Sequence, residues 1–123
     1  MKSILKTARG TIRLPTFFPV TTFGSRFPLD RLLQPFLGRF AKGILVSHFY
    51  AQKITAQQLP VFIDSGGFAG LFKGSRVFHL PNGTHGIQTR EGSRITPESV
   101  LRFQEQHADI AATLDFIITP DTS

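Results

Sequence analysis

Apolar residues follow two different spacings along this chain. From Pro28 to Phe40 they recur at gaps of three and four residues, which places them on one face of a helix that Pro35 is expected to break or kink. Elsewhere they form short runs between glycines and polar residues, at positions 43–47, 61–63 and 110–116. Such runs are typical of strands buried in a parallel sheet.

Local signals predict most of the remaining elements. Residues 11–21 combine apolar positions with prolines and are expected to be extended, and residues 51–58 suit a helix of about two turns. The Asn82-Gly83 pair lies between extended runs in the segment 77–95. Because both residues tolerate positive φ, this pair predicts a β-hairpin.

The last helix has a clear beginning. Thr96 supplies a hydroxyl cap, Pro97 suits the first helical position, and Glu98 places an acid in the first turn. We expect this helix to end near His107. The predicted order is therefore an extended segment, then repeated strand–helix units, with a hairpin inserted before the last helix, and this order indicates a parallel sheet.

The amino-acid composition excludes some kinds of functional site and favours one kind of partner. The 123 residues include 13 Phe and no Cys, which excludes disulfides and thiolate metal sites within the chain and fits a reducing compartment. The formal charge of +6 favours a polyanionic partner such as nucleic acid, although many basic domains have no such partner. No uncharged apolar run approaches the ~18 residues of a membrane span, and no secretory signal is present, so we expect a cytoplasmic protein without membrane contact.

The segment Asp64-Ser65-Gly66-Gly67-Phe68 is the strongest candidate for chemistry. It follows a predicted buried strand, and its two glycines would let a ligand approach the backbone closely. In a β/α barrel, an acid at this end of a strand lies on the catalytic face. The alternative is an ordinary turn in which Asp64 only caps the strand.

Asp115 occupies the same position relative to the next predicted strand. Two carboxylates at the ends of adjacent parallel strands would share one rim, where paired acids can act on glycosidic bonds. The alternative is that Asp115 caps a following helix.

Several ordered blocks together resemble the tRNA-guanine transglycosylase (queuine tRNA-ribosyltransferase) family. Residues 10–20 are similar to its opening G-x-I-x-T-P-x-F-M-P-V, and residues 62–68 to its L-T-D-S-G-G-F-Q signature. Residues 43–46 resemble its second strand. The segment 95–115, with its Thr-Pro-Glu and its Leu-Asp, resembles L-T-P-E…Q…G-A-D-I…D-E.

The resemblance implies a fold and an activity. It implies that residues 1–123 form the N-terminal half of a (β/α)8 TIM barrel, an α/β fold, with a β-hairpin insertion. The implied enzyme is a pentosyltransferase that exchanges guanine in tRNA for a 7-deazaguanine through a covalent glycosyl intermediate. The partners would be tRNA and a guanine or 7-deazaguanine base.

The resemblance also implies roles for individual residues. Asp64 corresponds to the catalytic acid/base that contacts the purine. Ser65, Gly66, Gly67 and Phe68 correspond to the base pocket, in which Phe68 would stack on the purine. Asp115 corresponds to the acid that accepts hydrogen bonds from the guanine edge.

Departures from the family pattern keep two alternatives open. Ala69 replaces a Gln, residues 47–50 (Ser-His-Phe-Tyr) replace Asn-Thr/Ala-Tyr-His, and residues 116–117 replace Glu-Cys. One alternative is a relative that modifies guanine in DNA, and the other is a non-catalytic, partner-binding subunit of the family. The family's nucleophilic carboxylate and its zinc ligands correspond to no residue here, so we expect no cofactor in this chain and zinc in a full-length member.

Weaker signals surround the hairpin. His79 and His85 flank its turn and could bind a metal, although surface histidines are common in such turns and no third ligand follows. Lys73, Arg76, Arg90 and Arg94 could contact phosphates, or could simply form a solvated face.

A half barrel would leave open sheet edges and uncovered apolar faces. We therefore expect the chain to find cover in a homodimer or with a partner chain. Because no residue here corresponds to the family's nucleophile, we also expect the chain to be inactive alone.

Overall fold

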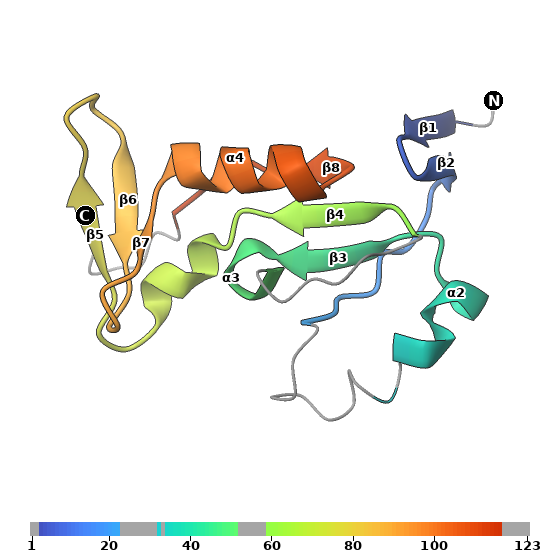
Figure 1. Cartoon of the computed structure of the whole chain (residues 1–123), viewed down its shortest axis with the longest axis horizontal. Helices are drawn as coiled ribbons and strands as arrows, with labels where there is room; N and C mark the ends of the chain where they lie inside the picture. The colour runs from blue at the N-terminus through green and yellow to red at the C-terminus, as the bar shows by residue number, and fades with distance from the viewer. Residues whose placement is uncertain (1–2, 23–31, 33, 52–58, 117–123) are drawn as a thin grey trace.

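The computed structural model describes residues 3–22, 32, 34–51 and 59–116. Within these ranges the chain forms one two-stranded and two three-stranded sheets, with three short α-helices between them. Figure 1 shows the sheets along the long axis of the molecule, with the two-stranded sheet at one end and the antiparallel three-stranded sheet at the other. The predicted helix at 51–58 lies almost entirely outside the described residues.

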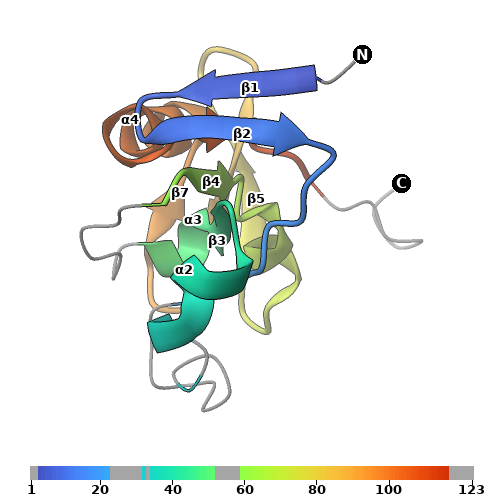
Figure 2. The ribbon, with the colours of Figure 1, turned by 90° about the vertical axis from the view of Figure 1, so that its right-hand side faces the viewer.

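The two-stranded sheet is a hairpin of β1 (Ser3–Thr7) and β2 (Gly10–Leu14). Its strands run across the view in Figure 2, in which the strands of the central sheet are seen nearly end on. Ile12 is the buried residue of β2. Arg9, in the turn, donates from Nη1 to the Asp109 carboxylate at 2.6 Å and thereby attaches the hairpin to the chain beyond the last helix.

The central sheet is parallel, as the sequence predicts. It has the order β3 (Ile44–Ser47), β4 (Val61–Asp64), β8 (Ile110–Ala111), and Val20 forms a further parallel bridge to Leu45. Alternate residues of β3 and β4 are fully buried, whereas those between them are only half-buried. The sheet therefore packs one face tightly against the core.

Among the predicted helices, the segment up to Phe40 is interrupted near Pro35 as expected, and the last helix is confirmed. Where the sequence predicts a break at Pro35, the described residues form a 3-10 turn, η1 (Gln34–Phe36), and one α-turn, α2 (Leu37–Phe40), because proline cannot continue an α-helix. Helix α4 (Pro97–His107) is confirmed with its cap: Ser99 N donates to Thr96 Oγ1 at 3.0 Å, and Thr96 N donates to Ser99 Oγ at 2.9 Å.

The predicted hairpin is also confirmed. Strands β5 (Arg76–His79) and β6 (His85–Gln88) are antiparallel, and β7 (Arg94–Ile95) adds to β6 as a third strand. In the turn, Thr84 N donates to Asn82 Oδ1 at 3.0 Å, and Gly83 takes a φ of 86°. The Asn-Gly pair thus performs the role expected of it.

The predicted half barrel is wrong. The described strands form three separate small sheets with no barrel closure, and the helices between them are few and short. The strand expected at 110–116 is only two residues long, and residues 112–116 are irregular. Closing a barrel requires long strands with matched tilt and stagger, which two- and four-residue strands do not supply.

Two apolar clusters meet at α4. The first packs around β3 and β4, with Phe103 of α4 against it; the second contains Ile87, Ile95 and Val100. The buried Gln104 lies at their junction, where its Nε2 donates to the carbonyl oxygens of Ile63 at 3.1 Å and Ala112 at 2.7 Å. One side chain thus joins α4 to β4 and to the segment after β8.

Two notable short elements follow the parallel strands. Helix α3 (His48–Ala51) begins directly after β3, and the 3-10 helix η2 (Gly67–Leu71) begins after two further residues beyond β4. Across the described residues, no helix is both long and apolar enough to cross a membrane.

Replacing Gln104 by Leu tests this junction. The substitution keeps a similar volume and removes the side-chain donor from both carbonyl oxygens, of which that of Ile63 keeps the longer bond from Ala112 N at 3.3 Å. We therefore expect the free energy of unfolding to fall by about 1–3 kcal/mol. Urea titration followed by circular dichroism measures the change. Gln106→Leu, at an exposed position of the same helix, is the matched control and should stay within about 0.5 kcal/mol of the parent protein. Equal effects of the two substitutions would contradict the assigned role of Gln104.

Candidate functional site

A cavity of about 480 Å3 opens where the carboxyl ends of β3 and β4 meet the segment after β8. All six residues that the sequence predicts for the site line this cavity. The lining consists of Ser47, Asp64, Ser65, Gly66, Gly67, Phe68, Ala112, Thr113 and Asp115. The structure therefore brings the two predicted acids, which are far apart in the sequence, to one cavity.

Asp64 is the last residue of β4 and lies opposite Ser47 in the register. Its Oδ1 accepts from the backbone N–H of Gly66 at 3.0 Å and from that of His48 at 3.3 Å. Within the described part of the chain, Oδ2 receives no hydrogen bond. Two backbone donors thus fix the orientation of the carboxyl group and leave one oxygen for a ligand.

Ser65 connects the segment after β4 to Asp115. Its buried hydroxyl donates to Asp115 Oδ1 at 2.5 Å and accepts from Gly67 N at 3.2 Å. Asp115 itself is exposed and has an irregular backbone on either side. The Ser65 hydroxyl is therefore what ties this carboxyl group to the cavity.

Glycine is required at positions 66 and 67 for two different structural reasons. Gly66 takes a φ of 71°, which side chains other than glycine rarely adopt. Gly67 lies against Asp115, and a Cβ at this position would overlap the Asp115 carbonyl oxygen and lie 2.8 Å from its Oδ1. The group that approaches the Gly67 backbone closely is therefore the Asp115 segment of the chain itself, where the sequence predicts a ligand.

The side chains of Phe68 and Ala69 lie in different environments. Phe68 is 63% exposed beside the cavity, and its ring meets that of Phe72 edge-on with centroids 6.3 Å apart. Ala69 is buried in the second apolar cluster. The position at which the resembling family has Gln therefore faces the core here and offers the cavity no amide.

Sequence reasoning missed His48 as a separate feature. It follows β3 directly, it is only 6% exposed, and its Nδ1 is buried without a hydrogen-bond partner in the described structure. Burial lowers the pKa of His48 below its usual value of 6.5, against the opposing effect of the Asp64 charge. The only signal in the sequence was the altered stretch at 47–50, which contains this histidine.

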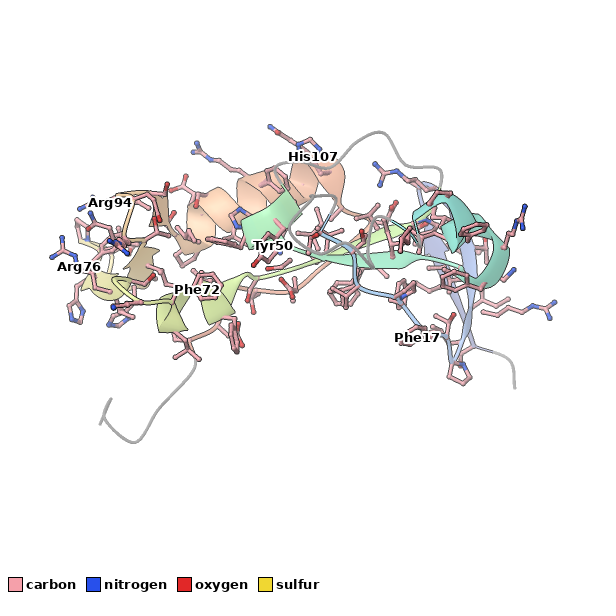
Figure 3. The ribbon with its side chains drawn as sticks, turned by 90° about the horizontal axis from the view of Figure 1, so that it is seen from below. Phe17, Tyr50, Phe72, Arg76, Arg94 and His107 are labelled. Atoms are coloured by element: carbon pink, nitrogen blue, oxygen red, sulfur yellow. The ribbon has the colours of Figure 1, made fainter. Side chains whose placement is uncertain are left out.

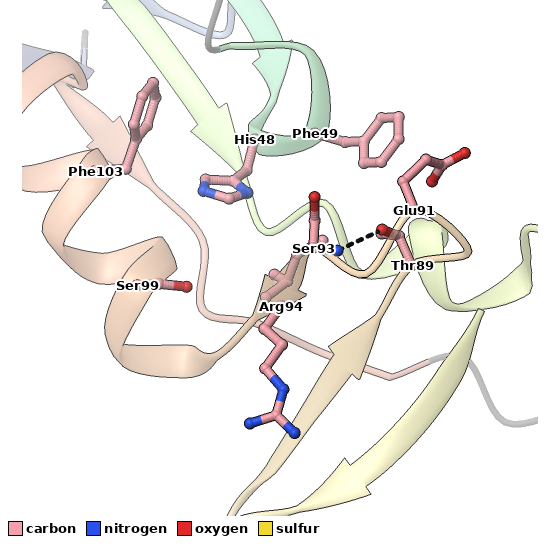
Figure 4. Close-up of a pocket in the computed structure, with 9 residues that line it drawn as sticks. His48, Phe49, Thr89, Glu91, Ser93, Arg94, Ser99 and Phe103 are labelled. Atoms are coloured by element: carbon pink, nitrogen blue, oxygen red, sulfur yellow. Dashed lines mark hydrogen bonds between the residues drawn. The ribbon is translucent and has the colours of Figure 1, made fainter.

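His48 also lines a second cavity of about 400 Å3, between α3, the β6–β7 turn and α4. In Figure 4 its ring lies between Phe103 and Ser93, while the side chain of Arg94 extends away from it. The rings of His48 and Phe103 are edge-on at 5.3 Å. The polar Nδ1 is thus enclosed by the folded chain, next to apolar rings.

The structure also places the weaker candidates. His79 and His85 face each other across the hairpin with ring centroids 4.5 Å apart. Among the residues that the structure describes, no group of three or more His, Cys, Asp or Glu side chains could hold a metal ion. Phe116 packs near His85 at 6.0 Å, and Ile117 lies outside the described residues.

Comparison with known proteins does not give a family. No protein-family model matches this chain, and no curated protein matches it. The resemblance to tRNA-guanine transglycosylases thus remains a hypothesis that depends on the sequence blocks themselves.

The buried His48 predicts a dependence of stability on pH. Because its pKa is lower in the folded than in the unfolded chain, the unfolded chain takes up a proton first as the pH falls. We expect the free energy of unfolding to be insensitive to this group above pH 6.5 and to decrease below it, until the folded-state pKa is reached. Denaturant titrations from pH 7.5 down to about pH 5 measure this dependence.

His48→Gln should remove most of the decrease, since a Gln side chain carries no charge in this range. His79→Gln, at an exposed position on β5, is the control for losing a histidine. An unchanged pH dependence in the His48 variant would contradict the assignment.

Proposed function

We propose that this cavity binds guanine or a 7-deazaguanine, and that the protein exchanges such bases in tRNA as a pentosyltransferase. The observation that carries the proposal is the Ser65–Asp115 hydrogen bond at 2.5 Å, which holds Asp115 in the same cavity as Asp64. The proposal depends on this cavity and on the resemblance of its residues to the family, and does not require a barrel.

The chemistry of the cavity suits a purine. Guanine carries N–H donors on one edge, and a carboxylate offers acceptor oxygens only, so an acid complements that edge. In the described structure the hydrogen bonds to Asp64 and Asp115 use Oδ1 of each. Oδ2 of Asp115 is therefore left as an acceptor for the base edge, and Oδ2 of Asp64 is left for proton transfer. The exposed Phe68 ring supplies an apolar plane for stacking.

Base exchange would use the two acids differently. The bond between the sugar C1′ and guanine N9 breaks with its electron pair on guanine, and a carboxylic acid can supply the proton that neutralises the departing base. We assign this step to Asp64, whose orientation is set by two backbone donors, and the recognition of the base edge to Asp115. The covalent glycosyl intermediate requires a further carboxylate, and the resemblance assigns that role to no residue of this chain, so we propose that the chain is inactive alone.

The choice of partner rests on charge and on the resemblance. The chain has 14 Lys and Arg residues against 8 acids, an excess that attracts a polyanion. The resemblance selects tRNA among polyanions. A guanine-modifying relative that acts on DNA is the closest competitor and is distinguished by substrate below.

Base binding is tested by calorimetric titration of the chain with guanine and with 7-deazaguanine. Asp115→Asn replaces one charged acceptor by an amide of the same shape, and we expect binding to weaken by about 10- to 100-fold, the value of a charge-assisted hydrogen bond. Glu105→Gln, on the exposed side of α4, is the control for the loss of one negative charge and should leave binding unchanged. Equal affinity of the Asp115 variant and the parent chain would refute the assigned pocket.

Exchange is tested with labelled guanine and either tRNA or duplex DNA, in a protein that contains this chain together with a candidate nucleophile. Incorporation into tRNA that Asp64→Ala abolishes supports the proposal, and incorporation into DNA alone supports the competing relative. Base binding without exchange in such a protein would identify a non-catalytic subunit and overturn the proposed activity.

A further inference from the structure

We infer that the outer face of the β5–β6–β7 sheet binds an unpaired segment of RNA. The choice of RNA as the ligand rests on the proposed function. The arguments from the charge and the stacking surface of this sheet are independent of that function. This sheet lies at the opposite end of the molecule from the β1–β2 hairpin (Figure 1). It contributes no residue to the cavity of Asp64 and Asp115.

The strand register divides the sheet into two chemically different faces. Val77 pairs with Ile87 and Ile87 with Ile95, and both isoleucines are buried against Ala69 and Val100. Because successive side chains of a strand point to opposite faces, the neighbouring pairs must point outward. That outer row consists of Arg76, Gln88 and Arg94, which are also paired across the three strands.

A third arginine lies at one end of this sheet. Gly74 and Arg90 lie in turns just beyond the Arg76–Gln88 pair, at the end of the strands next to Arg76. A Cβ on Gly74 would lie 2.8 to 3.2 Å from the side-chain carbons of Arg90. The aliphatic part of Arg90 therefore covers Gly74, and all three arginines are exposed.

Two of the three guanidinium groups are held in place without a carboxylate. Arg76 donates from Nε and Nη2 to Gln88 Oε1, at 3.2 and 2.8 Å. Arg94 lies over the ring of Phe78, with its Cζ 4.6 Å from the ring centroid. Figure 3 shows Arg76 and Arg94 together at this end of the molecule.

Phe78 in turn depends on a glycine. A Cβ on Gly86 would lie 2.6 Å from the Phe78 ring, so the ring occupies the space that a side chain would take. Gly86, Phe78 and Arg94 thus form a stack whose outermost layer is a flat guanidinium group. The Arg94 guanidinium lies over Phe78, and an unpaired base can stack on its exposed side, as bases of single-stranded RNA do on arginine.

The charge of this region is not neutralised within the described structure. Between residues 72 and 96 the sequence has Lys73, Arg76, Arg90 and Arg94 against a single acid, Glu91. The ion pairs that the described residues form are Arg9–Asp109 and Arg102–Glu98, and neither involves these arginines. Arg76 and Arg90 can therefore hold phosphates while Arg94 stacks on a base.

The test uses the 123-residue chain and a fluorescein-labelled 12-nucleotide RNA of mixed sequence without self-complementarity, followed by fluorescence anisotropy at several salt concentrations. Loss of two phosphate contacts in the double variant Arg76→Gln, Arg90→Gln should reduce the slope of log affinity against log salt by about 1.4. The control, Lys6→Gln with Arg13→Gln, removes the same charge from exposed positions on β1 and β2 and should leave the slope nearly unchanged. Circular dichroism checks that each variant keeps its fold.

Arg94→Lys separates stacking from charge, because lysine keeps the charge and lacks the plane. We expect about fivefold weaker binding of the RNA with an unchanged salt slope. Equal losses in the control and in the arginine variant would overturn the inference, as would undiminished binding by Arg94→Lys. Tighter binding of an RNA duplex, or of DNA of the same sequence, would also overturn it. Binding is measured without any free base, so its failure is distinct from a failure of base exchange.

Discussion

The arrangement of this molecule depends on how the segment after β8 is held against β4. Strand β8 pairs with β4 over only two residues, too few to fix the following chain by ladder hydrogen bonds alone. Gln104 adds a bridge from α4 to the carbonyl oxygens of Ile63 and Ala112, and Ser65 adds a second bridge to Asp115. These two side chains hold the segment with Asp115 beside β4, and they couple the cavity to the packing of α4.

Elements that depend mainly on residues close together in the sequence could be predicted. The cap of α4 depends on Thr96 and its nearest neighbours, and the hairpin depends on the Asn82-Gly83 turn, so both were predicted correctly. The barrel was wrong because closure depends on strand length and stagger across the whole sheet, which no local pattern records. Helix α3 was not predicted either, since only four residues form it and they carry no helical spacing.

In the candidate site, too, some features could be predicted from the sequence and others depend on tertiary packing. The segment 64–68 lies at the end of β4 as predicted, and Asp115 lines the same cavity. Asp115 lies four residues beyond the end of β8, so the Ser65 hydrogen bond, and not the shared edge of parallel strands, holds it there. The contact between Gly67 and Asp115, and the burial of Ala69, depend on tertiary packing and could not be read from the residues. His48 was missed because a single histidine after a strand gives no indication of how deeply it will be buried.

The two-faced sheet of β5, β6 and β7 restricts how this part of the chain can change in evolution. Insertion of a single residue within β6 would shift all later positions by one and exchange the two faces, so that Gln88 would turn toward the core and Ile87 toward solvent. The turn between Leu80 and Thr84 has no such constraint, because it is exposed or half-buried and forms no strand pairing. In descendants of this protein, changes of length should therefore accumulate at the hairpin tip, while the strands keep their number of residues.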